Sequence, residues 1–162
     1  MRSFIKSLQC AALGIRACFA ERNFRFHIAL GVYMFAYLLI YDWFKLTRGE
    51  WAAIVLASAL VLAAEAGNTA LEALVDLVIQ QKNNLAGRVK DIAAGAVLLS
   101  ALGAVGVGIA VLWQPAAFRA MFRYYQNNPA MLAVLILSLI ATGWFVWHKK
   151  SGAKEGKERR GH

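Results

Sequence analysis

The sequence predicts an all-α integral membrane protein. Of its 162 residues, 60% are hydrophobic, a larger share than in ordinary soluble domains, and the chain contains two prolines. Four apolar runs each come close to the ~20 residues that a helix needs to cross a bilayer. These runs are Ile28–Leu46, Trp51–Ile79, Ile92–Trp113 and Pro129–Trp147. We therefore expect four transmembrane helices.

The residues before the first span predict a helix that lies on the membrane surface. Apolar side chains recur there at helical spacing, whereas Lys6, Gln9 and Arg16 fall on other faces. The apolar members are Phe4, Ile5, Leu8, Ala11, Ala12, Ile15 and Phe19. A cleaved signal peptide is the alternative, but Arg16 interrupts the apolar stretch that such a peptide requires.

The later elements have their own local signals. Span two starts at Trp51, an aromatic residue of the type found at membrane interfaces, and span four starts at Asn128-Pro129, a cap residue followed by proline at the first helical position. The tail from Ser151 to His162 is charged, contains three glycines and has no apolar period, so we expect it to be disordered. The chain divides into residues 1–128 and an extra span with its tail, residues 129–162.

Basic residues are distributed unevenly about the four spans. The net charge is +9, and a nucleic-acid partner is less consistent with the apolar spans than a membrane is. Fourteen Lys and Arg residues precede span one, lie between spans two and three, or follow span four, whereas the opposite side holds four: Lys45, Arg48, Arg119 and Arg123. The positive-inside rule then predicts a multi-pass membrane protein with both termini and the Gln80–Asp91 loop in the cytoplasm. Cys10 and Cys18 fall on this cytoplasmic side, where we expect reduced structural thiols.

A row of polar residues within span two is the main functional signal. Glu65, Asn68, Glu72 and Asp76 are spaced by three, four and four residues. At ~100° per residue this spacing places all four on one narrow face of a helix. Carboxylates at membrane depth are energetically expensive and usually mark functional sites.

The chemistry of these side chains favours a magnesium and phosphate site. Carboxylate and amide oxygens without His or Cys suit Mg²⁺, which one or two carboxylates can hold together with substrate phosphate oxygens. Glu21, just before span one, could supply a second carboxylate, and Arg88, Lys90 and Asp91 lie in the predicted Gln80–Asp91 loop. The two cations could bind a polyphosphate. The sequence has no Gly-x-x-x-x-Gly-Lys-Ser/Thr loop, so helix ends would have to hold any nucleotide.

Spacing alone leaves three interpretations open for the polar row. It could catalyse a reaction, it could couple the transport of a proton or cation, or it could form a structural network between helices. A small ion-coupled membrane transport protein is thus an alternative to an enzyme, although it leaves the Arg88–Asp91 segment without a role.

Three segments resemble the prokaryotic diacylglycerol kinase family. They are residues 65–76 (EAGNTALEALVD), residues 87–97 (GRVKDIAAGAV) and residues 21–27 (ERNFRFH). The last segment is similar to the undecaprenol kinase branch of that family. The resemblance covers about residues 3–113.

The resemblance implies an enzyme with defined residue roles. The family is expected to form homotrimers of three-span subunits with a surface helix, and to transfer the γ-phosphate of magnesium-ATP to a lipid hydroxyl. By motif, Glu65 would be the general base and Asn68 would position the reacting groups. Glu21 and Glu72 would bind the metal. Lys90 and Arg88 would bind ATP phosphates, with Asp91 and Asp76 supporting the nucleotide site.

The acceptor is expected to be diacylglycerol or undecaprenol, and the residues 21–27 favour undecaprenol. The fourth span and the basic tail exceed the three-span pattern of the family. Their presence distinguishes this chain from the expected kinase unit.

Overall fold

The computed structural model describes residues 2–81 and 83–148, which fold into six α-helices without a strand in this part of the chain. The helices are α1 (Arg2–Cys18), α2 (Arg22–Ile40), α3 (Arg48–Val78), α4 (Asn84–Leu112), α5 (Pro115–Asn127) and α6 (Pro129–Trp147). Four of them, α2, α3, α4 and α6, are long and apolar enough to cross a membrane. The prediction of an all-α membrane protein with four spans and an N-terminal amphipathic helix is therefore confirmed.

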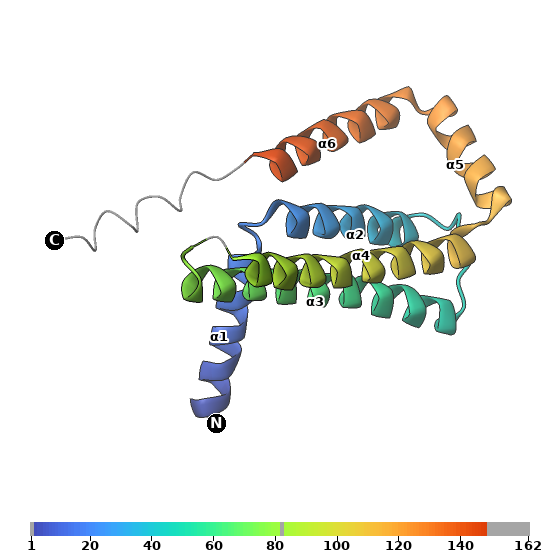
Figure 1. The fold of residues 1–162 in the computed structure, drawn as a ribbon. Helices are drawn as coiled ribbons and strands as arrows, with labels where there is room; N and C mark the ends of the chain where they lie inside the picture. Colours follow the sequence, from blue (N-terminus) through green and yellow to red (C-terminus); the bar gives the residue numbers. More distant parts are fainter. Residues whose placement is uncertain (1, 82, 149–162) are drawn as a thin grey trace.

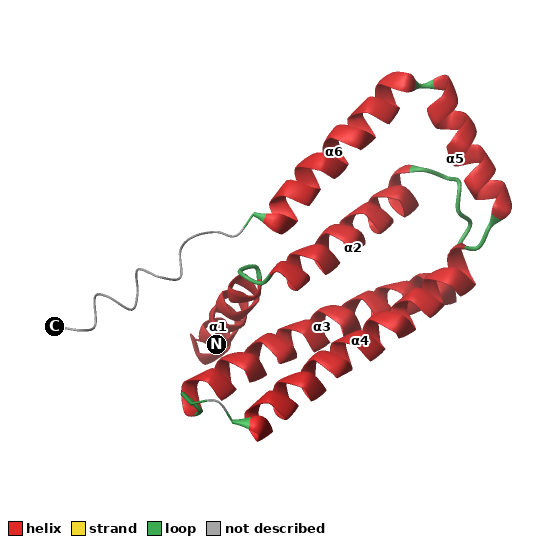
Figure 2. Cartoon of the chain, turned by 45° about the horizontal axis from the view of Figure 1, so that its top comes forward, coloured by secondary structure: helices red, strands yellow, loops and turns green. Residues whose placement is uncertain are grey.

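The long helices lie beside one another, and α3 and α4 form the closest pair (Figure 1). Helix α2 packs against α3 on one side and against α6 on the other. Helix α1 leaves the bundle at a steep angle beside the start of α2 (Figure 1). Helix α5 connects the end of α4 to the start of α6 (Figure 2).

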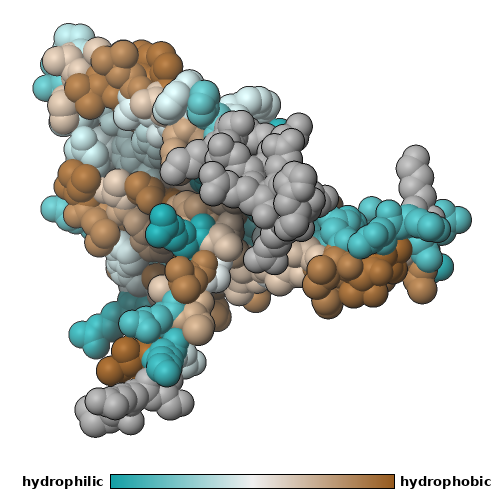
Figure 3. All heavy atoms as spheres, turned by 90° about the vertical axis from the view of Figure 1, so that its left-hand side faces the viewer, coloured by the Kyte–Doolittle hydropathy of each residue, from teal (hydrophilic) through white to brown (hydrophobic). Residues whose placement is uncertain are grey.

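A small core holds α2, α3 and α4 together away from the α1 end. Leu38, Ile54 and Val111 are buried there, one from each helix, and Phe35 stacks beside Trp51 with ring centroids 6.5 Å apart. The face drawn in Figure 3 carries separate hydrophobic and hydrophilic patches. Exposed leucines such as Leu56 and Leu99 suit helices that are surrounded by lipid.

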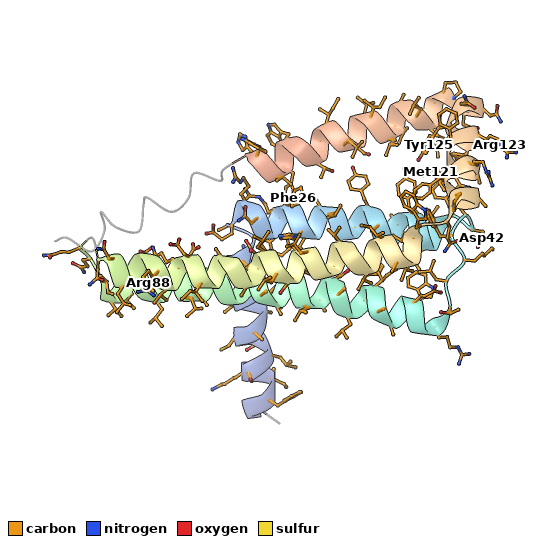
Figure 4. The ribbon with its side chains drawn as sticks, turned by 45° about the vertical axis from the view of Figure 1, so that its right-hand side comes forward. Phe26, Asp42, Arg88, Met121, Arg123 and Tyr125 are labelled. Atoms are coloured by element: carbon orange, nitrogen blue, oxygen red, sulfur yellow. The ribbon has the colours of Figure 1, made fainter. Side chains whose placement is uncertain are left out.

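Aromatic and amide contacts close the end of the bundle that includes α5. Tyr41 and Trp43 stack at 4.0 Å in the α2–α3 loop, and Tyr124 of α5 packs edge-on against both. The Gln114 side chain accepts from the Lys45 backbone N–H at 3.2 Å and donates to the Lys45 carbonyl at 3.1 Å. Figure 4 shows Asp42, Met121, Arg123 and Tyr125 at this end and Arg88 toward the other.

Two predicted boundaries were wrong. The first span was expected at Ile28–Leu46, but its helix runs from Arg22 to Ile40, because Tyr41 turns to an extended conformation and a polar loop follows. The predicted Gln80–Asp91 loop is mostly helical, since the Asn83 side chain caps α4 by accepting from the Leu85 and Ala86 N–H groups.

Further predictions concerned the fourth span, the two cysteines and the C-terminal tail. The bounds of α6 equal those of the predicted fourth span, whereas the sequence did not predict α5. Cys10 is exposed and Cys18 is buried, and both are free thiols as expected. The basic tail beyond His148 lies outside the described residues.

Candidate active site on helix α3 and the α1–α2 corner

The polar row on α3 changes from buried to exposed along the helix. Glu65 is 3% exposed and Asn68 is 9% exposed, whereas Glu72 is half-buried and Asp76 is exposed. A common helix face was predicted for these residues. Burial thus decreases along the row. We call the buried end at Glu65 the dry end and the solvent-exposed end at Asp76 the wet end.

The side-chain amide of Asn68 is hydrogen-bonded through its nitrogen but not through its oxygen in the described part of the chain. Its Nδ2 donates to Oε1 of Glu72 at 2.9 Å, which fixes the orientation of both side chains. Its Oδ1 is buried and has no hydrogen-bond partner among the described residues. A buried oxygen without a partner is costly in a finished structure, so this atom is available to a bound group.

The turn between α1 and α2 brings further polar residues to Glu65. The Asn23 side chain and the carboxylates of Glu21 and Glu72 lie within interaction range of the Glu65 carboxylate. Glu21 is the N-cap residue of α2, but its side chain makes no capping hydrogen bond and is exposed. Its carboxylate is therefore free to bind another group.

Asn23 was given no role in the sequence analysis, although it lies in the segment 21–27. Its position as the second residue of α2 gives no signal by itself, because a polar residue at a helix start is common. The packing of the α1–α2 corner against α3 is what brings it to Glu65.

A second cluster lies at the wet end of the row. Lys90 Nζ of α4 donates to Asp76 Oδ1 at 2.5 Å, with the lysine side chain one-third exposed and the aspartate two-thirds exposed. Arg88 and Asp91 are exposed on the same part of α4. The cations predicted to bind phosphate are thus on helical turns beside Asp76, not in a loop.

The cluster around Glu65 and the Lys90–Asp76 cluster lie at different positions along α3. Eleven residues from Glu65 to Asp76 correspond to about 16 Å on a straight helix. Within one chain, Lys90 is consequently paired with Asp76 and not with Glu65. A ligand that contacts both ends of the row must be an extended one.

The donor set fits magnesium. Glu21 and Glu72 offer carboxylate oxygens, hard ligands of the kind that Mg²⁺ prefers. The described residues contain no group of three or more His, Cys, Asp or Glu side chains placed to enclose a metal. An ion held by two carboxylates must complete its shell with water or with substrate oxygens.

An apolar cavity adjoins the dry end of the row. It has a volume of about 990 Å³, lies between α2, α3 and α4, and is lined by residues that include Gly31, Val61, Leu62 and Ala104. Val61 and Leu62 are about one helical turn before Glu65. An apolar chain could occupy this space with a polar end group at Glu65.

Comparison with known proteins identifies the family. Residues 9–112 match the family described as prokaryotic diacylglycerol kinase. A diacylglycerol kinase of Synechocystis sp. is 41% identical over 115 residues, which are 70% of this chain and 64% of the relative. An undecaprenol kinase of Bacillus subtilis is 35% identical over 112 residues, which are 68% of this chain and 89% of the relative.

The chain spans less than two thirds of the length of the Synechocystis relative. No solved structure matches it. The family match ends at Leu112, the last residue of α4, so α5 and α6 lie beyond it. Because the match covers more than half of the chain, including the α3 row and the α1–α2 corner, the protein belongs to the prokaryotic diacylglycerol kinase family.

Proposed function

We propose that this protein is a membrane lipid kinase that transfers the γ-phosphate of ATP directly to a lipid hydroxyl group. The lipid oxygen forms a bond to the γ-phosphorus while the bond from that phosphorus to the β–γ bridging oxygen breaks. The hydroxyl proton passes to the Glu65 carboxylate, and ADP leaves with the electron pair of the broken bond. Such a reaction depends mainly on positioning and on neutralising charge, which a few side chains can provide.

The burial of Glu65 is the observation that carries this proposal. Its side chain is 3% exposed in an apolar helix, and the ion pairs of the described residues do not include it. A carboxylate that is removed from water and left without a cation is suited to accept a proton. Asn68, one turn away and buried, can orient the reacting groups through its free Oδ1.

We assign the metal to the two other glutamates of the cluster. Glu21 and Glu72 would hold Mg²⁺, with Asn68 fixing the Glu72 side chain by its 2.9 Å hydrogen bond. Bound Mg²⁺ supplies positive charge that offsets the charge of the ATP phosphates. The exposure of Glu21 leaves its carboxylate reachable from solvent, the side from which magnesium-ATP arrives.

The wet end of the row would receive the nucleotide. Lys90 would exchange part of its interaction with Asp76 for the ATP phosphates, and Asp76 would keep the ammonium group in place. Arg88 adds a second exposed cation on the same helix, and Asp91 supports the nucleotide side of the site.

The apolar cavity supports a lipid acceptor. Its lining by Gly31, Val61 and Leu62 would accommodate an acyl or prenyl chain whose hydroxyl reaches Glu65. The named relatives include a diacylglycerol kinase and an undecaprenol kinase, so either alcohol fits the family. Residues 21–27 favour undecaprenol.

We further propose a homotrimer in the bacterial inner membrane with both termini in the cytoplasm. The excess of basic residues on the Arg88 side of the spans supports this orientation. The trimer is supported by the separation of Lys90 from Glu65 within one chain, since a neighbouring subunit could bring the two clusters together.

Radiolabelled phosphate transfer tests the function. Purified protein in mixed micelles receives labelled magnesium-ATP with diacylglycerol and undecaprenol in parallel. We expect label on at least one lipid, and its loss in Glu65→Gln, which removes the base and preserves the side-chain volume. Glu50→Gln is the matched control, because Glu50 lies at the other end of α3 and glutamine can also serve in its capping box.

Three outcomes separate the interpretations. Label that disappears in Glu65→Gln and persists in Glu50→Gln supports the kinase with Glu65 as its base. If the Glu65→Gln variant still labels lipid, Glu65 is not the general base. Folded protein that labels neither lipid contradicts the proposed reaction and favours ion-coupled transport.

A further inference from the structure

A buried arginine lies where the ends of three helices meet. Arg25, in the first turn of α2, is 5% exposed. A buried charged group is tolerated when it is well hydrogen-bonded, so its partners indicate what it holds together. The proposed reaction assigns it no role.

The guanidinium of Arg25 bonds to two separate backbone segments. One terminal nitrogen, Nη1, donates to the carbonyl oxygens of Phe19 at 2.9 Å and Ala20 at 3.1 Å. The other, Nη2, donates to the carbonyl oxygen of Val146 at 2.9 Å. The planar guanidinium can reach both segments at once because its donors point in fixed, different directions.

These carbonyls belong to the C-terminal ends of two helices. Phe19 and Ala20 directly follow α1, and Val146 lies in the last turn of α6. The last carbonyls of a helix have no partner within the helix and carry partial negative charge. One cation thus caps α1 and α6 together while it belongs to α2.

A second arginine strengthens the contact with α6. The guanidinium of Arg22 lies 5.2 Å from the ring centroid of Trp147, and that of Arg25 lies 5.9 Å from the ring of Phe145. Stacking of this kind is attractive for an arginine over an aromatic face. The last turn of α6 therefore contacts Arg22, directly before Asn23, and Arg25, two residues after it.

The same corner carries two residues of the candidate site. Glu21 and Asn23 lie between Ala20 and Arg25, the residues joined by the Arg25 hydrogen bond. Their positions relative to Glu65 depend on the conformation of this short turn. Helix α6, which lies beyond the family match at Leu112, is attached to the turn through Arg25.

We propose that Arg25 is a positioning residue that links α6 to the metal-binding corner, so that docking of α6 holds Glu21 and Asn23 in place beside Glu65. The effect on the metal rests on the proposed function, whereas the link itself does not. Loss of the link should loosen the turn and weaken metal binding, without removing any metal ligand or the base.

Cys18 offers a probe that needs no turnover. Cys18 is buried, with 8% of the residue exposed, it directly precedes Phe19, and its thiol donates to the Gly14 carbonyl at 3.4 Å. In a Cys10→Ser background, which removes the exposed thiol, we measure the rate at which maleimide alkylates Cys18 in folded protein. We expect several-fold faster labelling in Arg25→Lys, because one ammonium group cannot bond to both segments, and also in Trp147→Ala.

Tyr33→Phe is the matched control. Tyr33 connects α2 to α6 away from the corner, through hydrogen bonds of 3.0 Å to Ser138 and to Thr142. We expect its loss to lower the thermal midpoint without changing the labelling rate of Cys18. Equal labelling rates in the wild type, Arg25→Lys and Trp147→Ala would overturn the link.

Manganese binding then tests the consequence for the site. Electron paramagnetic resonance of added Mn²⁺ gives its affinity directly, and we expect roughly tenfold weaker binding in Arg25→Lys, as is typical when support of a metal ligand is lost. Trp147→Ala should shift the affinity in the same direction, and Tyr33→Phe should not. Faster Cys18 labelling with unchanged Mn²⁺ affinity would show that Arg25 is structural and would overturn the positioning role.

The two proposals can fail separately. If wild-type protein transfers no phosphate, the proposed function is wrong, while the labelling comparison still decides whether α6 is linked to the corner.

Discussion

Glu65 and Glu72 are the same residue type on one face of α3, yet their surroundings differ. Glu65 is buried, whereas Glu72 is half-buried and accepts a hydrogen bond from Asn68. A carboxylate that is oriented by a neighbour and partly open to solvent is better suited to hold a cation than to take a proton. The environment of each glutamate thus argues for a different role.

We predict that Glu72→Gln raises the magnesium concentration needed for half-maximal phosphate transfer by roughly tenfold or more, as expected for a lost metal ligand. Glutamine keeps the volume of the side chain and can still bond to Asn68. The measurement is a magnesium titration of the labelled-ATP assay. An unchanged titration would remove Glu72 from the metal site, and Glu50→Gln serves as the control for an acid lost elsewhere on α3.

Tyr125 should titrate later than an ordinary tyrosine. Burial and its 2.5 Å hydrogen bond with Tyr37 raise the pKa of Tyr125 to about 12. Because the folded pKa lies above the ordinary value of about 10, its contribution to stability is complete below pH ~10 and is lost as the pH rises toward 12. Tyrosinate absorbance should show a late step that is absent in Tyr125→Phe. A late step of equal size in the variant would assign it to another tyrosine.

At the scale of helices, the start of α3 is fixed by local hydrogen bonds. The Thr47 side chain accepts from the Glu50 N–H at 3.3 Å, and the Glu50 carboxylate accepts from the Thr47 N–H at 2.6 Å. This reciprocal capping box satisfies two backbone donors at the helix entrance. It lies at the opposite end of α3 from the proposed site.

Replacing this cap should affect stability and leave chemistry intact. We predict that Thr47→Ala lowers the free energy of unfolding by about 1 kcal/mol, the usual effect of losing an N-cap side chain. Denaturation in mixed micelles gives the stability, and Thr47→Ser, which keeps the hydroxyl, is the control. A large loss of phosphate transfer in folded Thr47→Ala would show that this end of α3 participates in the reaction.

Hydropathy predicted the spans because lipid-facing helices need apolar side chains, and α6 has no charged residue over its whole length. The hydropathy search missed the start of α4 at Asn84, because the first turns of that helix are polar. Hydropathy does not detect helical segments that lie in water. It also missed α5, where Arg119 and Arg123 alternate with aromatic residues. The cap at Asn83 was the local signal that could have extended α4.

The candidate site was predictable where its residues share one helix. The spacing of Glu65, Asn68 and Glu72 places them on one face whatever the tertiary structure is. Asn23 and the pairing of Lys90 with Asp76 depend on how separate helices pack, and a single sequence does not contain that information. The link between Arg25 and Val146 spans 121 residues of chain and is beyond any local pattern.

At the scale of the whole molecule, the residues of the proposed site and the extra helices α5 and α6 occupy different parts of the sequence. Every proposed catalytic, metal-binding and nucleotide-binding residue precedes Leu112, where the family match ends. Helices α5 and α6 contribute contacts to α2, among them the hydrogen bonds of Tyr33 and Arg25. They thus pack against the part of the chain that carries the candidate site, without supplying any residue of that site.

We predict that truncation after Gln114 leaves measurable phosphate transfer with a raised magnesium requirement. Transfer should persist because the reacting groups remain, and the requirement should rise because Arg25 loses the Val146 carbonyl. The labelled-ATP assay with a magnesium titration measures both. Complete loss of transfer by a truncated protein that keeps its helical circular dichroism would place α5 or α6 within the catalytic unit.

The helices of the bundle differ in length, and the larger part of the difference falls at the end where α3 turns into α4 (Figure 1). Helix α3 has 31 residues and α4 has 29, whereas α2 and α6 have 19 each. At 1.5 Å per residue, α3 is about 46 Å long, well beyond a hydrocarbon layer of about 30 Å. The surplus extends past the start of α2, on the side of Asp76 and Lys90 (Figure 1). The proposed nucleotide and the proposed lipid alcohol could therefore each reach this pair of helices from its own solvent.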